Sequence, residues 1–215
     1  MGLLRRCIAV GRPVGRLLHG TGSKLDRRLR ETKAWLDRVV IAERLCPFAA
    51  PVRAPPKLHL VASRAASSAD VVHEIAREAD ALRAGIGQPH AAETTLLVLG
   101  QTIGDAPLGW LDLVSLSWRL QEEAIVARGH SEHLQLVLFH PLATHSTYVT
   151  HGAPTDAGDY TIRAPHPTVQ LLREMDVLKA VKSYPDTDGI PGRNRTRFRR
   201  MGADQAAQLL SACYE

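Results

Sequence analysis

The stretch that decides the fold runs from Leu134 to Glu174. It opens with the apolar run Leu134-Gln135-Leu136-Val137-Leu138-Phe139, which ends abruptly in His140-Pro141. A polar connection follows, and regular structure is expected to resume at Arg163-Ala164-Pro165-His166-Pro167, before a run that we interpret as helical, Leu171-Leu172-Arg173-Glu174. A buried strand that ends in a polar loop is where α/β proteins place their sites. The pattern therefore predicts a pocket at the end of this strand, without naming a reaction.

Helical and strand patterns alternate along the chain around this stretch. They predict strands near 57–63, 94–99 and 133–139, and helices near 24–45, 68–85 and 109–128. Ser67 or Ser68 is expected to cap the second helix, and the second strand, apolar throughout, is expected to be covered on both faces. This order predicts an α/β fold, with a small mixed or parallel three-stranded sheet, flanking helices, a basic N-terminal extension and a helical C-terminal tail. A ferredoxin-like arrangement is the alternative, because the sequence does not show in which direction each strand runs.

Length and cysteine content restrict the class of protein. A chain of 215 residues suits one domain with extensions, large enough to bury roughly 70% of its surface on folding. Its apolar runs are shorter than the ~20 residues that a transmembrane helix needs. Cys7, Cys46 and Cys213 are odd in number and far apart, which favours a reducing compartment over a disulfide framework.

Positive charge is concentrated at the two ends of the chain, which carries a net charge of +5. No acidic residue precedes Asp26, and small and apolar residues separate the early cations. Those cations are Arg5, Arg6, Arg12, Arg16 and Lys24. This composition is typical of a mitochondrial targeting segment, and a disordered basic arm is the alternative. We therefore divide the chain into a basic extension (1–22), one α/β domain (23–202) and a C-terminal helix (203–215), and we expect a location on the matrix side of mitochondria.

A second basic cluster lies in the tail, where residues 193–200 contain five arginines. Those arginines are Arg193, Arg195, Arg197, Arg199 and Arg200. Such a density suits a phosphate backbone, an acidic protein surface or anionic lipid, and solvated charge without a partner is the alternative. We expect the last four of these arginines to bind a partner, namely other protein subunits, RNA or anionic lipid.

Several side chains are candidates for chemistry in the predicted pocket. Cys46 and His140 could form a thiolate–imidazolium pair, or they could be a buried structural cysteine beside a satisfied histidine. Arg163, Arg173 and Arg193 are candidates for binding a carboxylate or phosphate, because the guanidinium group can hold two oxygens at once. The alternative is that Arg173 pairs with a neighbouring acid such as Glu93 and that Arg163 bonds loop carbonyls. We expect His140 and Arg173 to be largely buried, because each follows or interrupts an apolar run.

A metal site and a bound cofactor are not expected. Four histidines follow the third predicted strand, but their spacing gives no compact pair of ligands. They are His140, His145, His151 and His166. The chain also has no glycine-rich phosphate loop.

A series of short motifs follows in order over roughly residues 32–202. The motifs are Trp35-Leu36, Val39-Val40-Ile41, Leu45-Cys46-Pro47-Phe48-Ala49, Glu93-Thr94-Thr95-Leu96, Phe139-His140-Pro141, Asp159-Tyr160-Thr161, Arg163 with Pro165 and Pro167, Leu171-Leu172-Arg173-Glu174, Ile190-Pro191 and Arg193-Asn194. This ordered set resembles an uncharacterised family, domain of unknown function 1415. No activity is established for the family. The resemblance therefore supports the domain boundaries and the pocket but implies no reaction.

The chain departs from the family pattern at several polar positions. The family has Asn where this chain has Arg44, and an Asp-Tyr-x-Phe element where Leu142-Ala143-Thr144-His145 stands. The family's Asn-Arg-Ser-Pro-Tyr-Pro becomes Ile162-Arg163-Ala164-Pro165-His166-Pro167. These replacements weaken the enzyme hypothesis, because a catalytic arrangement tolerates little change in its geometry.

Two classes of function remain. In the first, the chain is a non-catalytic accessory subunit of a larger mitochondrial assembly, such as a respiratory complex or a mitoribosome. In the second, it is an enzyme or binder for a small anionic metabolite that uses His140, Arg163, Arg173 and Cys46. The replaced residues near the predicted pocket and the basic ends of the chain favour the first class. The sequence does not identify the assembly.

Overall fold

The structure, a computed structural model, describes residues 21–146 and 155–215, so most of the expected basic extension lies outside the described residues. The helices are α1 (Thr21–Trp35), continued by the π-helix η1 (Leu36–Ile41), α2 (Ala49–Val52), α3 (Ser68–Ala84), α4 (Trp110–Arg119), continued by the π-helix η2 (Leu120–Val126), the 3-10 helix η3 (Ala157–Thr161), α5 (Glu174–Ser183), α6 (Ile190–Met201) and α7 (Ala203–Ser211). The strands are β1 (Leu58–Ala62), β2 (Thr94–Val98), β3 (Thr102–Ile103), β4 (Ala106–Pro107), β5 (Leu134–Phe139) and β6 (Thr168–Arg173). The predicted α/β class is confirmed.

Within the described residues the main sheet has four strands in the order β1-β2-β6-β5, so the prediction of three strands was wrong. β1 and β2 run parallel and are joined through α3, whereas β6 lies antiparallel to both β2 and β5. The sheet is therefore mixed. Direct parallel pairing of β1 with β2 excludes the ferredoxin-like alternative, whose sheet is antiparallel. A separate two-stranded hairpin, β3-β4, follows β2.

The additional strand is β6, which the sequence analysis had placed at the start of a helix. Val169 and Leu171 are fully buried, and Thr168 is as well, so the segment is covered as a central strand requires. The apolar spacing from Leu171 continues into Met175 and Leu178 of α5, and this continuity mimics a single helix. The helix in fact begins at Glu174, directly after the strand.

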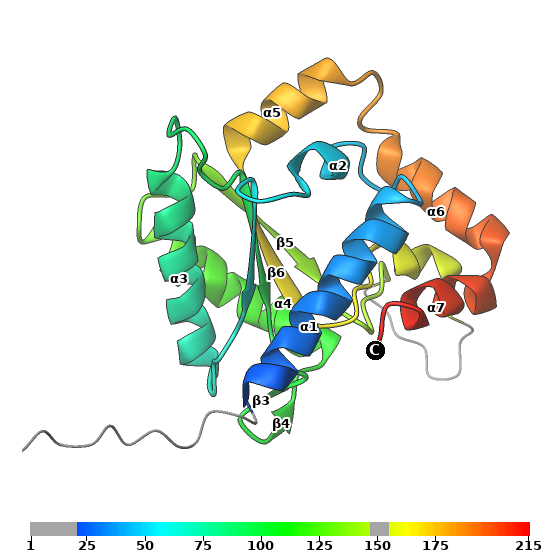
Figure 1. Ribbon diagram of the computed structural model, residues 1–215, viewed down its shortest axis with the longest axis horizontal. Coiled ribbons are helices and arrows are strands. Elements are labelled where there is room, and N and C mark those ends of the chain that lie inside the picture. Colours follow the sequence, from blue (N-terminus) through cyan, green and yellow to red (C-terminus); the bar gives the residue numbers. More distant parts are fainter. Residues whose placement is uncertain (1–20, 147–154) are drawn as a thin grey trace, which may run out of the picture.

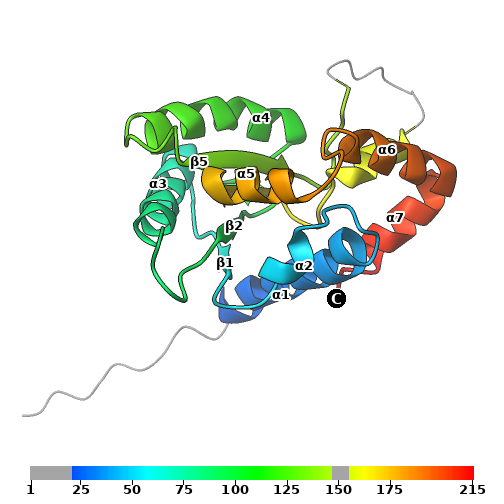
Figure 2. The ribbon, with the colours of Figure 1, turned by 90° about the horizontal axis from the view of Figure 1, so that it is seen from above.

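Two hydrophobic cores lie on the two faces of the sheet (Figures 1 and 2). On one face, α3, α4 and η2 pack against side chains such as Leu97, Val169 and Leu171. On the other face, α1, η1, α6 and α7 pack against side chains such as Leu58 and Leu96. Neighbouring residues of one strand thus serve different cores, because successive side chains point to opposite faces. This explains why every residue of β2 is buried, as its apolar sequence predicted.

Local sequence signals set the limits of the covering helices. The Ser67 hydroxyl accepts a hydrogen bond from the backbone N–H of Asp70 at 3.1 Å and caps α3, as one of the two expected serines. Phe198 of α6 is fully buried in the second core and anchors the arginine-rich helix. The side-chain amide of Asn194 also donates to the Leu45 carbonyl at 2.7 Å and ties α6 to the turn after η1. Among the described residues, no helix is both long enough and apolar enough to cross a membrane.

Candidate functional site

His140 lies at the end of β5, buried as its position after an apolar run predicted. One ring nitrogen, Nε2, is 2.8 Å from the carbonyl oxygen of Leu108, and the other, Nδ1, accepts the backbone N–H of Leu142 at 3.0 Å. The two bonds together define a neutral ring that carries its proton on Nε2. Burial lowers the pKa of His140, and the nearby positive charge of Arg163 lowers it further. His140 is therefore the satisfied histidine of the second alternative, and its two nitrogens hold the loop after β5.

Arg163 lies close to His140, as predicted, but its contacts are internal. Its Nε donates to the carbonyl of Ala143 at 3.0 Å. The guanidinium group also stacks over the Tyr160 ring, 4.4 Å from its centroid, and lies 3.9 Å from the Asp159 carboxylate. These contacts match the alternative in which Arg163 bonds a loop carbonyl. Its predicted role in anion binding stays a prediction.

Arg173 lies at the opposite end of the sheet from His140. Leu134, the first residue of β5, pairs with Arg173, so the length of β5 separates Arg173 from His140. At ~3.4 Å per residue this separation is about 20 Å. The four predicted pocket residues therefore do not share a cavity. The reason is that β6 runs antiparallel to β5 and carries its last residue away from the His140 loop.

Arg173 lies 3.9 Å from the carboxylate of Asp176, a neighbouring acid, as the alternative to anion binding expected. The acid that this alternative named as its example, Glu93, pairs instead with Lys57 at 3.0 Å. Arg173 is buried, as expected, and its Nε and Nη2 have no hydrogen-bond partner within the described structure. The guanidinium group packs closely against Gly85, where an added Cβ would lie 2.7 Å from Nη2. Gly85 follows α3, whose partially negative carboxyl end favours a cation.

Cys46 is exposed, which corrects the expectation of a buried structural cysteine. It follows η1 in the turn that Asn194 ties to α6, and no described imidazole contacts its sulfur. The residue is exposed as a whole, but its thiol is partly shielded from solvent, and this desolvation raises the pKa of Cys46. Hydrogen bonds from the backbone N–H groups of Phe48 and Ala49 oppose the rise. A thiol with a raised pKa is a poor nucleophile at neutral pH. The thiolate–imidazolium pair with His140 is therefore not formed.

The remaining histidines of the predicted group are separately occupied. The Nε2 of His145 is 3.0 Å from the Thr161 hydroxyl, whereas His166 contacts Glu31. His151 lies outside the described residues. Within the described ranges, no three histidine, cysteine or acidic side chains gather in a way that could hold a metal ion.

A buried polar cluster that the sequence analysis missed lies at the carboxyl ends of β1 and β2. Glu31 of α1 is fully buried, and its carboxylate is 2.5 Å from the Nε2 of His166. Arg27 at 3.3 Å and the backbone N–H of Glu215 at 3.1 Å complete the contacts of the carboxylate. Burial lowers the pKa of His166, and the bond to Glu31 opposes that shift. With these partners the cluster ties α1 to the start of β6 and to the C-terminal residues.

One signal in the sequence could have identified Glu31. Glu31 lies four residues before Trp35 and eight before Val39, on the same row of α1 and η1 as these two buried side chains. An acid on the apolar row of a helix needs a buried partner, and His166 provides it.

Most of the tail arginines are engaged within the molecule. Arg193 contacts Asp186, Arg197 contacts the Glu43 carbonyl, and Arg199 holds Asp156 at 2.6 Å. This last contact, together with the Gly158 backbone N–H, lowers the pKa of Asp156 to about 2. Two tail cations remain, Arg195 and Arg200, for which the described residues provide no hydrogen bond or ion pair.

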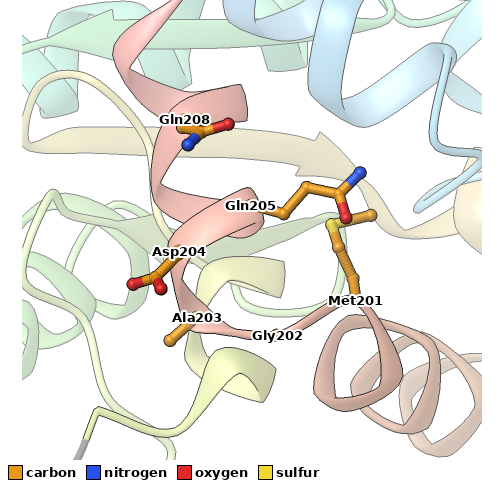
Figure 3. A pocket seen from close by; sticks show the side chains of 6 residues that line it. All are labelled: Met201, Gly202, Ala203, Asp204, Gln205 and Gln208. Carbon is orange, nitrogen blue, oxygen red and sulfur yellow. The ribbon is translucent and has the colours of Figure 1, made fainter.

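The turn between α6 and α7 contains an open hollow of about 450 Å³ (Figure 3). Met201 and Gln205 extend to one side of it, and Asp204 extends to the other. Its lining contains one ionisable side chain and none of the predicted site residues. The hollow is therefore a surface depression without an arrangement of groups for chemistry.

Arg44 has a positive backbone φ of 50°, in the left-handed region. Glycine and asparagine adopt this conformation more easily than arginine does. The positive φ gives a conformational reason for the asparagine that the family resemblance leads us to expect at this position. Arg44 adopts this backbone conformation at a cost in strain.

The comparisons agree with the motif analysis. A family model described as "Protein of unknown function (DUF1415)" matches residues 27–208. No curated protein and no solved structure matches the chain.

We predict that Arg44→Asn raises the free energy of unfolding by up to about 1 kcal/mol, because asparagine is less strained at positive φ. Arg64→Asn is the matched control, since Arg64 is also exposed but has an ordinary φ. Urea denaturation of the two variants measures the difference. An equal effect of the two substitutions would contradict a role for backbone strain at residue 44.

We predict that His140→Leu lowers the free energy of unfolding by about 1–3 kcal/mol, because the Leu108 carbonyl and the Leu142 N–H lose their buried partner. His140→Gln retains an amide for these groups and should cost less. Burial also lowers the pKa of His140 in the folded state, so the unfolded chain binds the proton more readily. The contribution of neutral His140 to the free energy of unfolding is fully present above about pH 6.5, the pKa in the unfolded chain, and is lost as the pH falls from there through the folded pKa.

Denaturation of the wild type and His140→Gln between pH 8 and pH 5 measures this dependence. The variant should lose less stability on acidification, although His145 and His166, whose pKa values are also lowered by burial, retain part of the slope. Identical slopes would show that His140 does not titrate as a buried neutral group.

Proposed function

The chain belongs to the DUF1415 family, for which no activity is described, and we propose that it is a non-catalytic accessory subunit of a larger mitochondrial assembly, such as a respiratory complex or a mitoribosome. The observation that carries the proposal is that the predicted reactive groups bond other parts of the same chain. His140 bonds two backbone groups, Arg163 bonds a loop carbonyl, and Arg173 lies about 20 Å from His140 at ~3.4 Å per strand residue. These side chains hold the fold and do not converge on one point where a substrate could react.

Unpartnered apolar side chains support a binding role. Leu111 and Trp118 of α4 are 60% and 73% exposed. On α5, Met175, Leu178 and Val181 are exposed at a spacing of three residues, and no residue of this helix is buried. Contiguous exposed apolar side chains are commonly covered by another molecule. A subunit inside an assembly would bury them against its neighbours.

The basic tail supports the same role, but with fewer available arginines than the sequence predicted. Arg197 and Arg199 already contact groups of this chain, so they contribute less to a partner than predicted. Arg195 and Arg200 remain as the tail cations best able to bind an external carboxylate or phosphate. The other basic feature, the composition of residues 1–25, supports import into mitochondria.

The second candidate function is binding of a small anionic metabolite. Arg173 favours it, because two of its guanidinium nitrogens have no partner among the described residues. Two other observations oppose it. Both nitrogens are shielded from solvent, and the carboxyl end of α3 and Asp176 supply negative charge nearby. The accessory-subunit proposal is therefore the better supported one.

We predict that wild-type protein sediments with a large particle when a lysate is fractionated by size, and that the double variant Arg195→Gln/Arg200→Gln is released at a lower salt concentration. The reason is that ionic contacts at the protein surface are screened as the Debye length falls from ~10 Å at 0.1 M salt to ~3 Å at 1 M. Detection of the protein across the gradient at increasing salt measures the release.

Arg199→Gln is the matched control for this experiment. It removes one charge from the same helix, but from an arginine that is already paired with Asp156. It should be released at the wild-type salt concentration. Wild-type protein that remains at the top of the gradient, in the size range of the free chain, would contradict the proposed function and favour the metabolite candidate.

A further inference from the structure

A groove of about 580 Å³ runs beside the edge strand β1. Its lining includes Arg30 and Lys33 of α1, and Leu58 and Leu60 of β1. Arg53, Pro55 and Pro56, which precede β1 in the chain, also line it. β1 is the outermost strand of the order β1-β2-β6-β5 (Figure 2). The groove, which Leu58, His59 and Leu60 line, therefore lies at an edge strand of the sheet.

The backbone of β1 offers unused hydrogen-bonding groups to this edge. The N–H of Ser63 bonds the Val98 carbonyl of β2, and the carbonyl of Lys57 accepts the N–H of Thr94. In a parallel pair, alternate residues turn their backbone groups toward the same neighbour, so the odd-numbered residues of β1 face β2. The backbone N–H and C=O groups of Leu58, Leu60 and Ala62 consequently point away from β2, toward the free edge of the sheet.

Few of these outward groups have a partner inside the molecule. The N–H of Leu58 reaches the Ala54 carbonyl at 3.4 Å. Within residues 21–146 and 155–215, no hydrogen bond engages the N–H or the carbonyl of Leu60, or the N–H of Ala62. Such an edge is a template for an additional strand.

Charge restricts what could pair with the edge. Among the described side chains that line the groove, the charged ones are Arg30, Lys33 and Arg53. Arg30 contacts Glu215 and Arg53 contacts Asp37, each at 2.6 Å, whereas Lys33 forms no ion pair within the described part of the chain. The groove therefore suits an acidic occupant.

Two occupants from this protein itself fit poorly on the same grounds. The residues before Asp26 contain five cations and no acid, so their charge would repel the groove. Pairing of two copies through β1 would bring together two copies of Lys33, whose charge has no ion-pair partner in the described part of the chain, and this is also repulsive. An acidic segment of another polypeptide has neither penalty.

We propose that β1 binds an extended acidic segment of a partner protein, which adds to the sheet as a fifth strand next to Leu58–Ala62. Main-chain hydrogen bonds to Leu60 and Ala62 supply affinity, and carboxylates that face Lys33 supply selectivity. The inference rests on the proposed function to the extent that it names one partner class for an assembly subunit. The groove is distinct from the tail arginines Arg195 and Arg200.

The test uses the full chain and a labelled model peptide, acetyl-(Glu-Val)₃-amide, with acetyl-(Lys-Val)₃-amide as the control of opposite charge. Fluorescence anisotropy should show saturable binding of the acidic peptide only. Two further peptides carry N-methyl groups on alternate backbone nitrogens, one on each set. A strand donates to its neighbour through one set only, so one of these peptides should bind about tenfold more weakly and the other should bind almost as the parent.

The matched protein variants are Lys33→Glu and Lys182→Glu. Both reverse one exposed lysine, but Lys182 lies on α5, away from the groove. Lys33→Glu should weaken binding of the acidic peptide by about three- to tenfold, the range expected for reversal of a surface charge contact. Lys182→Glu should leave binding unchanged, and circular dichroism should show that the two variants are equally folded.

Several outcomes would overturn the inference: equal binding of the basic peptide, indifference to both N-methylated sets, or equal effects of the two lysine variants. A dimer in sedimentation equilibrium that Lys33→Glu dissociates would show instead that a second copy occupies β1. The outcome is separable from that of the proposed function. Peptide binding without particle association would support the proposed site at β1 and contradict the proposed assembly role. Particle association without peptide binding would support the assembly role and contradict the site at β1.

Discussion

The hydrogen-bonded insertion of β6 between β2 and β5 is the constraint on which the rest of the structure depends. β6 is the last strand in the chain, yet both of its edges are paired inside the sheet. Val169 and Leu171 on one face complete the core under α3 and α4. Without β6, β5 would have no neighbour and the sheet would reduce to the β1-β2 pair. The fold therefore requires closure of a long loop before its centre can form.

The same insertion determines what the polar residues can do. Because β6 runs antiparallel to β5, Thr168 lies near the His140 end and Arg173 near the other end. Two of the motifs shared with the family are thereby separated by the length of the sheet. The groups near His140 bond the loop around them, and those near Arg173 pack against α3. Each polar cluster stabilises one end of the sheet, which agrees better with a scaffold than with a single reaction centre.

The sequence was informative where a signal was local. The apolar runs of β1, β2 and β5 and the serine cap of α3 predicted these elements within a residue or two, because burial and capping act over a few residues. β6 was missed because its apolar spacing continues into α5 and mimics one helix. Periodicity cannot separate a short buried strand from a helix when both are apolar.

The candidate site depended on information that is not local. Burial of His140 and Arg173 followed from their positions beside apolar runs, and the structure confirms it. Convergence of these residues required the direction of β6, which no residue pattern encodes. The Glu31–His166 pair was missed for a related reason, since it joins segments 135 residues apart. The position of Glu31 on the apolar row of α1 indicates that it needs a buried partner, but it does not indicate where in the chain that partner lies.

Native-state hydrogen exchange of the backbone amides tests the central role of β6 most directly. If β6 holds the sheet together, the amides of Val169 and Leu171 should exchange only through global unfolding, with an opening free energy within ~1 kcal/mol of that from denaturation. The outward amides of Leu60 and Ala62 on the free edge should exchange much faster. Exchange of the β6 amides through local opening, at a free energy well below that of the α3 amides, would contradict this account.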